Sequence, residues 1–253
     1  MNDTLDDTLD DAFSYCTQML REEDRDRFLA ALFAPAAARP VLHALYGFDL
    51  ETARVARRVR EPLAGEVRLQ WWHDVVAGGR SDEAAANPVA RALCATLTRY
   101  AIAPALMQGL IERRRAQLYG QPVLHEPDYE RGNAETHGAI LAAAMQCLDD
   151  GRAPGDRDLI AAAANAVGAA HDFSAVSLAP ADEAHAAELK VFAERNLNRA
   201  RALLRGAPPP VWPAFLPLAL IRPTLLRGTA GVLPAWRRQW ILWRAARDLP
   251  ARL

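Results

Sequence analysis

Lysine, serine and cysteine are scarce in this chain of 253 residues, and each scarcity excludes a class of chemistry. Lys190 is the only lysine and belongs to no G-x-x-x-x-G-K-S/T loop, so phosphate-loop and Schiff-base mechanisms drop out. The few serines lie outside any G-x-S-x-G motif, which leaves a hydrolase without support. The three cysteines are far apart and lack C-x-x-C spacing, so we expect a reducing compartment with neither disulfides nor a zinc site.

Net charge and hydropathy narrow the range of partners. The formal net charge is -1 at pH 7, which provides no overall field to attract nucleic acid. The N-terminus is acidic, unlike a secretory signal or a transit peptide. The alanine-rich run 159–170 is shorter than the ~20 apolar residues that span a bilayer. We therefore expect a cytoplasmic protein with no nucleic-acid partner and no transmembrane helix.

Apolar residues recur at the spacing of amphipathic helices over most of the chain, and alternating strand patterns are rare. One such stripe comprises Val41, Leu45, Phe48, Val55 and Val59. With 51% hydrophobic residues, a chain of this length can bury one substantial core. The predicted fold class is therefore all-α, in a single domain.

Several boundaries are marked in the sequence. Residues 1–12 carry too little apolar surface to offset the entropy of ordering, so we expect a disordered acidic tail before a helical domain over residues 13–253. Asn87-Pro88, Pro104 and Gly155-Asp156 are typical helix starts. The prolines at 208–210 predict a loop, and those at 213, 217 and 223 predict short or kinked helix.

A search for metal ligands finds no cluster that predicts a site. Asp-x-x-x-Asp pairs, which can hold Mg²⁺ when they face each other on helices, occur only in the acidic segment up to Asp11. Glu22/Asp26 and Glu126/Glu130 have the same spacing but lie in polar segments, where we expect solvated faces. The six histidines are scattered, with no pair at i, i+3 or i, i+4.

Several motifs together resemble the squalene/phytoene synthase superfamily. The most specific is Leu69-Gln70-Trp71-Trp72, and the similarity extends over nearly the whole chain. The supporting segments are 27–35, 44–48, Asn87-Pro88-Val89, 135–138 and the stretch from Pro213 to Trp240. The resemblance implies an isoprenoid-synthase-like helical bundle around a central apolar cavity.

The two aspartate motifs that hold Mg²⁺ against a diphosphate in active members are missing. The resemblance places Ala53, Arg54 and Arg57 at the three aspartate positions of the first motif, where two guanidinium groups would repel Mg²⁺. In the second motif the best match is Asp172, with Val176 at the final position, so one carboxylate remains at most. By this resemblance we expect neither a metal nor another cofactor.

These departures are similar to the branch of the superfamily that contains the mitochondrial respiratory complex I assembly factor. By that resemblance the chain is a non-catalytic interaction or assembly protein with a protein partner, such as a respiratory-complex subunit, and it would lie peripherally at the inner membrane.

The alternative is an active head-to-head prenyl transferase that uses Mg²⁺ and farnesyl or geranylgeranyl diphosphate with an atypical ligand set. The carboxylates available for such a set are Asp74, Asp149, Asp150 and Asp172. Four or more acidic side chains around one central pocket would contradict the non-catalytic interpretation.

Two hypotheses concern the arginines at the first motif. Arg54, Arg57 and Arg58 would suit a lipid phosphate or prenyl phosphate, because guanidinium groups form charge-assisted hydrogen bonds with it. The interpretation we favour is that they form ion pairs with nearby acids, namely Glu51, Glu61 or Glu66.

The tryptophans also allow two interpretations. Trp71 and Trp72 are consecutive and point about 100° apart on a helix, so we expect one of them in the core. Trp236, Trp240 and Trp243 follow i, i+4, i+7 spacing beside several arginines. Core packing of this stripe is the favoured prediction, and an interfacial helix on a membrane surface is the alternative.

Overall fold

The computed structural model describes residues 3–58, 61–120, 124, 127–152, 155–176, 183–228 and 233–253, and the side chains of residues 3–7, 56–58 and 127 lie outside the described part. Helices dominate these ranges and no strand occurs in them, which confirms the predicted fold class. In chain order the helical elements are α1 (Asp3–Glu23), α2 (Arg25–Ala31), η1 (Ala36–Ala38), α3 (Arg39–Arg58), α4 (Pro62–Val76), α5 (Ser81–Ala86), α6 (Pro88–Arg99), α7 (Pro104–Ala116), α8 (Pro127–Asn133), η2 (Ala134–Gly138), α9 (Ala139–Leu148), α10 (Arg157–Val176), α11 (Glu183–Leu204), η3 (Pro209–Leu220), α12 (Ile221–Arg227), α13 (Ala235–Ala245) and α14 (Leu249–Arg252).

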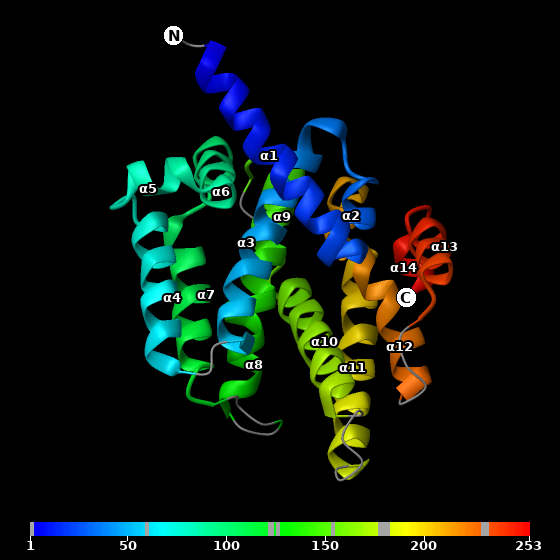
Figure 1. Cartoon of the computed structure of the whole chain (residues 1–253). Helices are drawn as coiled ribbons and strands as arrows, with labels where there is room; N and C mark the ends of the chain where they lie inside the picture. The colour runs from blue at the N-terminus through cyan, green and yellow to red at the C-terminus, as the bar shows by residue number, and fades with distance from the viewer. Residues whose placement is uncertain are drawn as a thin grey trace.

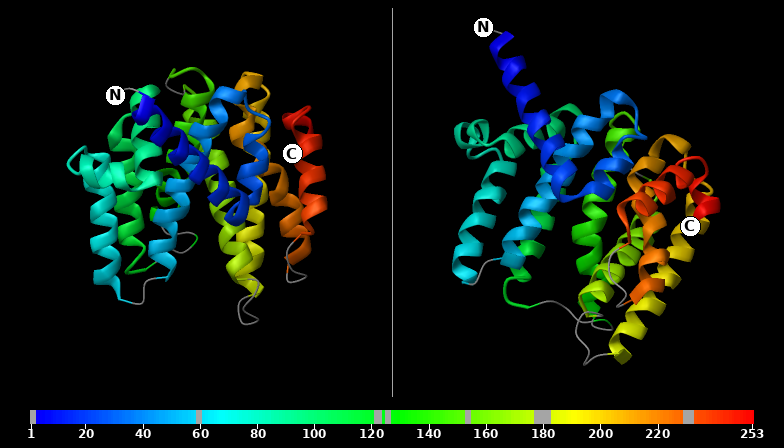
Figure 2. Two further views of the ribbon diagram at one scale, coloured as in Figure 1. Left: turned by 45° about the horizontal axis from the view of Figure 1, so that its top comes forward. Right: turned by 45° about the vertical axis from the view of Figure 1, so that its right-hand side comes forward.

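The helices form two groups (Figure 1). In one group α3, α4 and α7 stand side by side, and in the other α10 packs along α11. The segment η3 connects the second group to α12, and α13 packs on η3, α2 and α14. Both views in Figure 2 show α13 and α14 on the outside of the molecule.

The core of the first group is built on the predicted apolar stripe of α3. Val41, Leu45, Phe48 and Val55 are all buried, and Val59 lies outside the described residues. Trp72 of α4 packs edge-to-face on Phe48, with ring centroids 5.2 Å apart at 72°. Because each large side chain buried in this way contributes about 1.5–3 kcal/mol, this face fixes α4 against α3.

The predicted helix starts are confirmed. Asn87 caps α6, because its side chain accepts a hydrogen bond from the backbone N–H of Ala90 at 3.0 Å, and Pro88 is the first helical residue. Pro104 opens α7. Asp156 accepts from the N–H of Leu159 at 2.9 Å at the start of α10.

The N-terminal segment differs from the predicted disordered tail. The helix α1 begins at Asp3, so residues 3–12 are helical, and Ala12 is already buried. Arg91 of α6 donates a hydrogen bond to the carbonyl oxygen of Thr8 at 2.9 Å. Acidic residues near a helix N-terminus interact favourably with the helix dipole, and packing on α3 and α6 supplies the rest, so composition was a poor guide here.

Two elements depart from regular α-helix. The segment η3 is one continuous 3₁₀ helix that contains Pro213 and Pro217, and it begins at Pro209, within the predicted loop. The segment η2 is a π-helical turn between α8 and α9. Such turns are rare and frequently occur at functional sites, which directs attention to the residues around η2.

One described helix, α10, is long and apolar enough to cross a membrane by length and composition, with a mean hydropathy of 1.2 over its best window. However, 56% of that window is buried inside the molecule, where α10 packs on α11, η2 and α12. Since a buried core helix has the same composition as a span, α10 carries no argument for a membrane segment.

The tryptophans of α13 are exposed, so the prediction that they pack in the core is wrong. Trp236, Trp240 and Trp243 are 70%, 52% and 40% exposed. The helix instead buries its other face, through Leu242 and Ala245.

Candidate functional site

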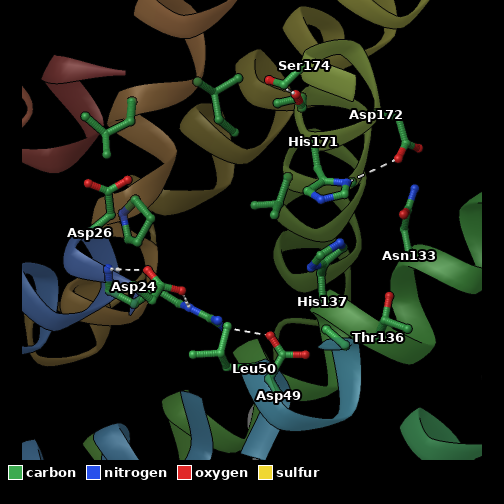
Figure 3. A pocket seen from close by; sticks show the side chains of 18 of the residues that line it. Asp24, Asp26, Asp49, Leu50, Asn133, Thr136, His137, His171, Asp172 and Ser174 are labelled. Atoms are coloured by element: carbon green, nitrogen blue, oxygen red, sulfur yellow. Dashed lines mark hydrogen bonds and ion pairs between the residues drawn. The ribbon is translucent and has the colours of Figure 1, made fainter. Parts of the chain in front are cut away.

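A pocket of about 530 Å³ is lined by residues from α1, α2, α3, α7, α8, η2, α10, η3, α12 and α13 (Figure 3). This volume lies within the range of small-molecule pockets. The predicted cavity therefore exists, but it is not purely apolar. Its charged lining residues are Glu23, Asp24, Asp26, Arg27, Asp49, Arg113, Arg114, Asp172 and Arg238.

Asp49 of α3 is the most deeply buried carboxylate of this pocket, at 5% exposed. Its Oδ2 accepts from Nη1 of Arg27 at 2.6 Å, and its Oδ1 accepts from Nη2 of Arg114 at 3.0 Å. Burial alone would raise the pKa of Asp49, but the two guanidinium groups outweigh it and hold this pKa well below its usual range. Asp49 is therefore an anion whose two oxygens each hold a different cation.

The carboxylates at the start of α2 are also paired with arginines. Asp24 caps α2 and accepts from Nε of Arg27 at 2.5 Å. Asp26 accepts from Nε of Arg238 at 2.8 Å, which ties α2 to α13. This contact corrects the prediction that Asp26 lies on a solvated face, since the side chain is only 17% exposed. Glu23 forms an ion pair with Arg54.

Asp172 of α10 lies on the opposite side of the pocket from Asp24 and Asp26 (Figure 3). Its Oδ2 accepts from the hydroxyl of Tyr129 at 2.8 Å, and its Oδ1 lies 3.4 Å from Nδ1 of His171. Burial would raise the pKa of Asp172, but these two neighbours lower it. Burial and the nearby Arg114 lower the pKa of His137 to about 4, so this imidazole is neutral at pH 7.

Close backbone approach shapes the wall between α8 and α10. A Cβ at Gly168 would collide with the side-chain amide of Asn133, and a Cβ at Gly132 would collide with the guanidinium of Arg113. Both glycines therefore make room for a polar side chain. In the adjacent π-turn, Thr136 donates to the carbonyl oxygen of Gly132 at 2.7 Å, and Thr136 and His137 both line the pocket.

The arrangement does not fit Mg²⁺. This ion requires near-octahedral oxygen coordination at about 2.0–2.1 Å, and the oxygens of Asp49 would first have to release Arg27 and Arg114. Five acidic side chains line the pocket, which meets the criterion of four or more acidic side chains that would contradict the non-catalytic interpretation. They do not converge, because the described residues contain no group of three or more His, Cys, Asp or Glu side chains that could hold a metal ion. Convergence of oxygens, rather than their number, is the relevant criterion.

The first-motif positions are distributed as follows. Ala53 lines the pocket. Arg54 donates from Nη1 to Oε1 of Glu51 at 3.1 Å and also pairs with Glu23, so the favoured ion pair with Glu51 is observed. The side chains of Arg57 and Arg58 lie outside the described part.

The second-motif positions and the alternative ligand set are not brought together. Val176 is the last residue of α10 and packs against the core. Of the four carboxylates of the alternative set, only Asp172 lines the pocket. Asp74 instead bonds to Gln70 and Arg80, while Asp149 and Asp150 follow the end of α9.

The Leu-Gln-Trp-Trp signature has a structural role on α4. Leu69 is completely buried, and Gln70 donates to Asp74 at 2.7 Å. Trp72 is 4% exposed, whereas Trp71 is half-buried and donates from Nε1 to Glu83 at 2.7 Å. The prediction that one of these tryptophans lies in the core is confirmed.

Sequence reasoning missed Asp49, although a signal was present. Asp49 follows Leu45 by four residues on the buried stripe of α3, where a charged side chain is unusual. A carboxylate on an apolar face predicts a buried cationic partner. The identity of that partner, Arg114 on α7, depends on the packing of two helices far apart in the sequence.

These observations define an all-α bundle whose central pocket holds carboxylates that are bound to arginines. The chain belongs to the squalene/phytoene synthase family, because the family model described as squalene/phytoene synthase matches residues 20–171. The fold is also that of a dehydrosqualene synthase crystallised with a ligand, with a TM-score of 0.68, 14% identity, and coverage of 96% of this chain and 98% of that chain.

Similar curated proteins bear a different description. The proteins named NADH dehydrogenase (ubiquinone) complex I, assembly factor 6 from Bos taurus and Homo sapiens are each 27% identical over 134 residues. The match covers 53% of this chain and 40% of each relative, so the chain matches less than half the length of these proteins.

Proposed function

We propose that this chain is a non-catalytic member of its family that assists the assembly of a respiratory complex through contact with a protein partner, peripherally at the inner membrane. The observation that carries the proposal is the pairing of the pocket carboxylates. Both oxygens of Asp49 are bound by arginines, and Asp172 accepts from Tyr129, so these anions stabilise the fold. The names of the assembly-factor relatives suggest the process, and a subunit of NADH dehydrogenase is the proposed partner.

Turnover is the direct test. Purified protein with Mg²⁺ and radiolabelled farnesyl or geranylgeranyl diphosphate is expected to form no coupled product, while a dehydrosqualene synthase under the same conditions does. Formation of a head-to-head product would establish the alternative, a Mg²⁺-dependent prenyl transferase, and would overturn the proposal.

Genetic complementation tests the assembly role without a catalytic assay. Deletion of the gene in its own organism is expected to lower the amount of assembled NADH dehydrogenase on native gels. Expression of the wild-type chain and of Asp172→Asn should restore it equally, because Asp172 is proposed to have no metal to hold. If Asp172→Asn is folded and expressed but restores nothing, the non-catalytic interpretation fails.

A second candidate function is the binding of a lipid phosphate or prenyl phosphate, and the open pocket of about 530 Å³ is the observation that favours it. The arginines first considered are less suitable, since Arg54 is engaged by two glutamates. Mass spectrometry of lipids extracted from the purified protein tests the idea. A co-purifying phosphorylated amphiphile would support it. Loss of that amphiphile in Arg54→Ala and Arg57→Ala would assign its phosphate to the first motif, and retention would assign it to the arginines that line the pocket. The absence of any amphiphile would end the idea.

A further inference from the structure

The outer face of α13 combines exposed aromatic and cationic side chains. Trp236, Trp240 and Trp243 recur at i, i+4 and i+7 and form one ridge, with the rings of Trp240 and Trp243 stacked 5.0 Å apart. The guanidinium of Arg247 lies 3.7 Å from the ring centroid of Trp243, which extends the ridge by one turn. These side chains are presented to solvent together.

The charge on this face has one sign. Arg237 and Arg244 are exposed and seven residues apart, so they flank the ridge on one side. The helix contains no acidic residue, and in the ranges that the structure covers neither arginine forms an ion pair. Asp248, the next acid along the chain, caps α14 through the N–H of Ala251. The face therefore complements an anionic surface.

Contacts on the inner side of α13 fix its orientation. Arg238 bonds to Asp26 of α2, while Leu242 and Ala245 are buried against the body of the molecule. These three residues lie on the opposite side of the helix from the tryptophans. The ridge consequently points away from the protein, and the helix α13 itself lies on the outside of the molecule (Figure 2).

The size of the ridge favours lipid over protein as the occupant. With the observed exposures, the three rings offer roughly 400 Å² of surface, taking about 250 Å² for a whole tryptophan side chain. A stable protein interface needs about 800 Å² on each partner. A membrane surface needs only shallow insertion of a few aromatic residues, and tryptophan with arginine is the composition typical of interfacial helices.

We infer that α13 docks the protein on an anionic lipid bilayer, with Trp236, Trp240 and Trp243 at the headgroup level and Arg237 and Arg244 against anionic headgroups. This surface rests on the proposed function, because it states how an assembly factor would be held at the membrane. None of these five residues lines the central pocket, so Asp172→Asn should leave membrane binding unchanged.

Vesicle flotation of the full chain tests the inference. The protein is expected to float with vesicles of phosphatidylcholine and phosphatidylglycerol, and to stay at the bottom with phosphatidylcholine alone. Changing all three tryptophans to alanine should lower the bound fraction at least about tenfold, as should Arg237→Glu with Arg244→Glu, given the attraction of each basic residue to anionic lipid. Raising the salt concentration should weaken binding, because it screens exposed charges.

Matched variants outside the exposed face of α13 provide controls. Leu63→Ala removes an equally exposed apolar residue from α4, and Arg205→Glu reverses an exposed arginine after α11; both should float like the wild type. The inference is overturned if the wild type does not bind anionic vesicles, if the tryptophan variant floats unchanged, or if the controls lose as much binding. Binding to soluble polyglutamate without binding to vesicles would also overturn it, in favour of an acidic protein.

The two proposals can fail separately. A chain that floats but does not restore NADH dehydrogenase in the deletion strain contradicts the assembly role alone. A chain that restores the complex but does not float contradicts the membrane face of α13 alone.

Discussion

Arginine is used in opposite ways in the central pocket and on α13. In the pocket, Arg27 and Arg114 share the carboxylate of Asp49, and their charge is neutralised inside the protein. On α13, Arg237 and Arg244 stand in solvent beside exposed tryptophans. The difference shows that an arginine in this chain indicates a binding surface only where it has no carboxylate partner within the protein.

The tryptophans likewise differ between the interior and α13. Trp72 fills the core beside Phe48, whereas Trp236 is 70% exposed on a helix with the same kind of apolar spacing. Helical periodicity identifies which residues share a face, but it does not determine which face is turned inward. On α13 the small and aliphatic residues were turned inward, and the aromatic face was left outside.

The largest expected effect comes from breaking the pocket network. Asp49→Ala leaves Arg27 and Arg114 facing each other without their shared carboxylate, so the free energy of unfolding should fall by about 3–5 kcal/mol. Urea denaturation measures it. Asp74→Ala, which removes a carboxylate that is 30% exposed, is the control and should have a much smaller effect. Equal losses in the two variants would mean that the ion pairs of Asp49 stabilise the fold no more than those of Asp74.

A paired substitution of tryptophans sharpens the contrast between core and edge. Trp72→Ala opens a cavity beside Phe48 and should lower the free energy of unfolding by about 3–5 kcal/mol. Trp236→Ala should change it by no more than about 0.5 kcal/mol, because the ring is in solvent. Urea denaturation of both variants under the same conditions measures the two changes. A large loss for Trp236→Ala would show that the ring is packed in solution.

A buried histidine makes the free energy of unfolding depend on pH, whereas the exposed face of α13 contains no such group. His43 is 3% exposed, and burial together with Arg39 lowers its pKa to about 4 from an ordinary value of 6.5. The unfolded chain therefore takes up a proton before the folded one. The contribution of His43 to the free energy of unfolding should be fully present above pH 6.5 and fall by about 3 kcal/mol as the pH approaches 4, at about 1.4 kcal/mol per pH unit. His137, whose pKa is also lowered to about 4, should add to the fall in the same range.

The control for this pH dependence is His43→Gln, which cannot titrate. Its free energy of unfolding should be lower overall but flatter between pH 6.5 and 4. An unchanged pH profile in this variant would assign the acid sensitivity to another group, such as His137, whose pKa is also lowered to about 4.

A smaller effect than that of the pocket network is expected at the contact between α13 and α2. Arg238→Gln removes the ion pair with the partly buried Asp26 of α2 and should cost about 1 kcal/mol. Hydrogen exchange should increase along α13 more than along α3. Uniform acceleration across both helices would instead mean that α13 does not open on its own.

Much of the fold could be predicted because its signals are local. The caps at Asn87 and Asp156 and the proline at 104 mark helix starts through contacts within one turn. The acidic N-terminus was predicted wrongly, because the apolar face that orders α1 is completed only by α3 and α6. Composition alone does not reveal which surface a segment will meet.

The candidate site was predicted only in part. The loss of the first motif at Ala53 and Arg54 can be read directly from the sequence, and the ion pair of Arg54 with Glu51 is local. The contacts of Asp49 with Arg114 and of Asp26 with Arg238 join residues 65 and 212 positions apart. No periodicity relates such positions, so these contacts could not be derived from it.

The sequence by itself determined the helices, their starts and the absence of the family's aspartate motifs, because each of these depends on residue identity within a few turns. Only the tertiary structure decided that the pocket carboxylates are occupied by arginines and that the tryptophans of α13 face outward. Both outcomes depend on which faces of separate helices meet, and the free energy of that choice comes from burial and ion pairing between distant segments.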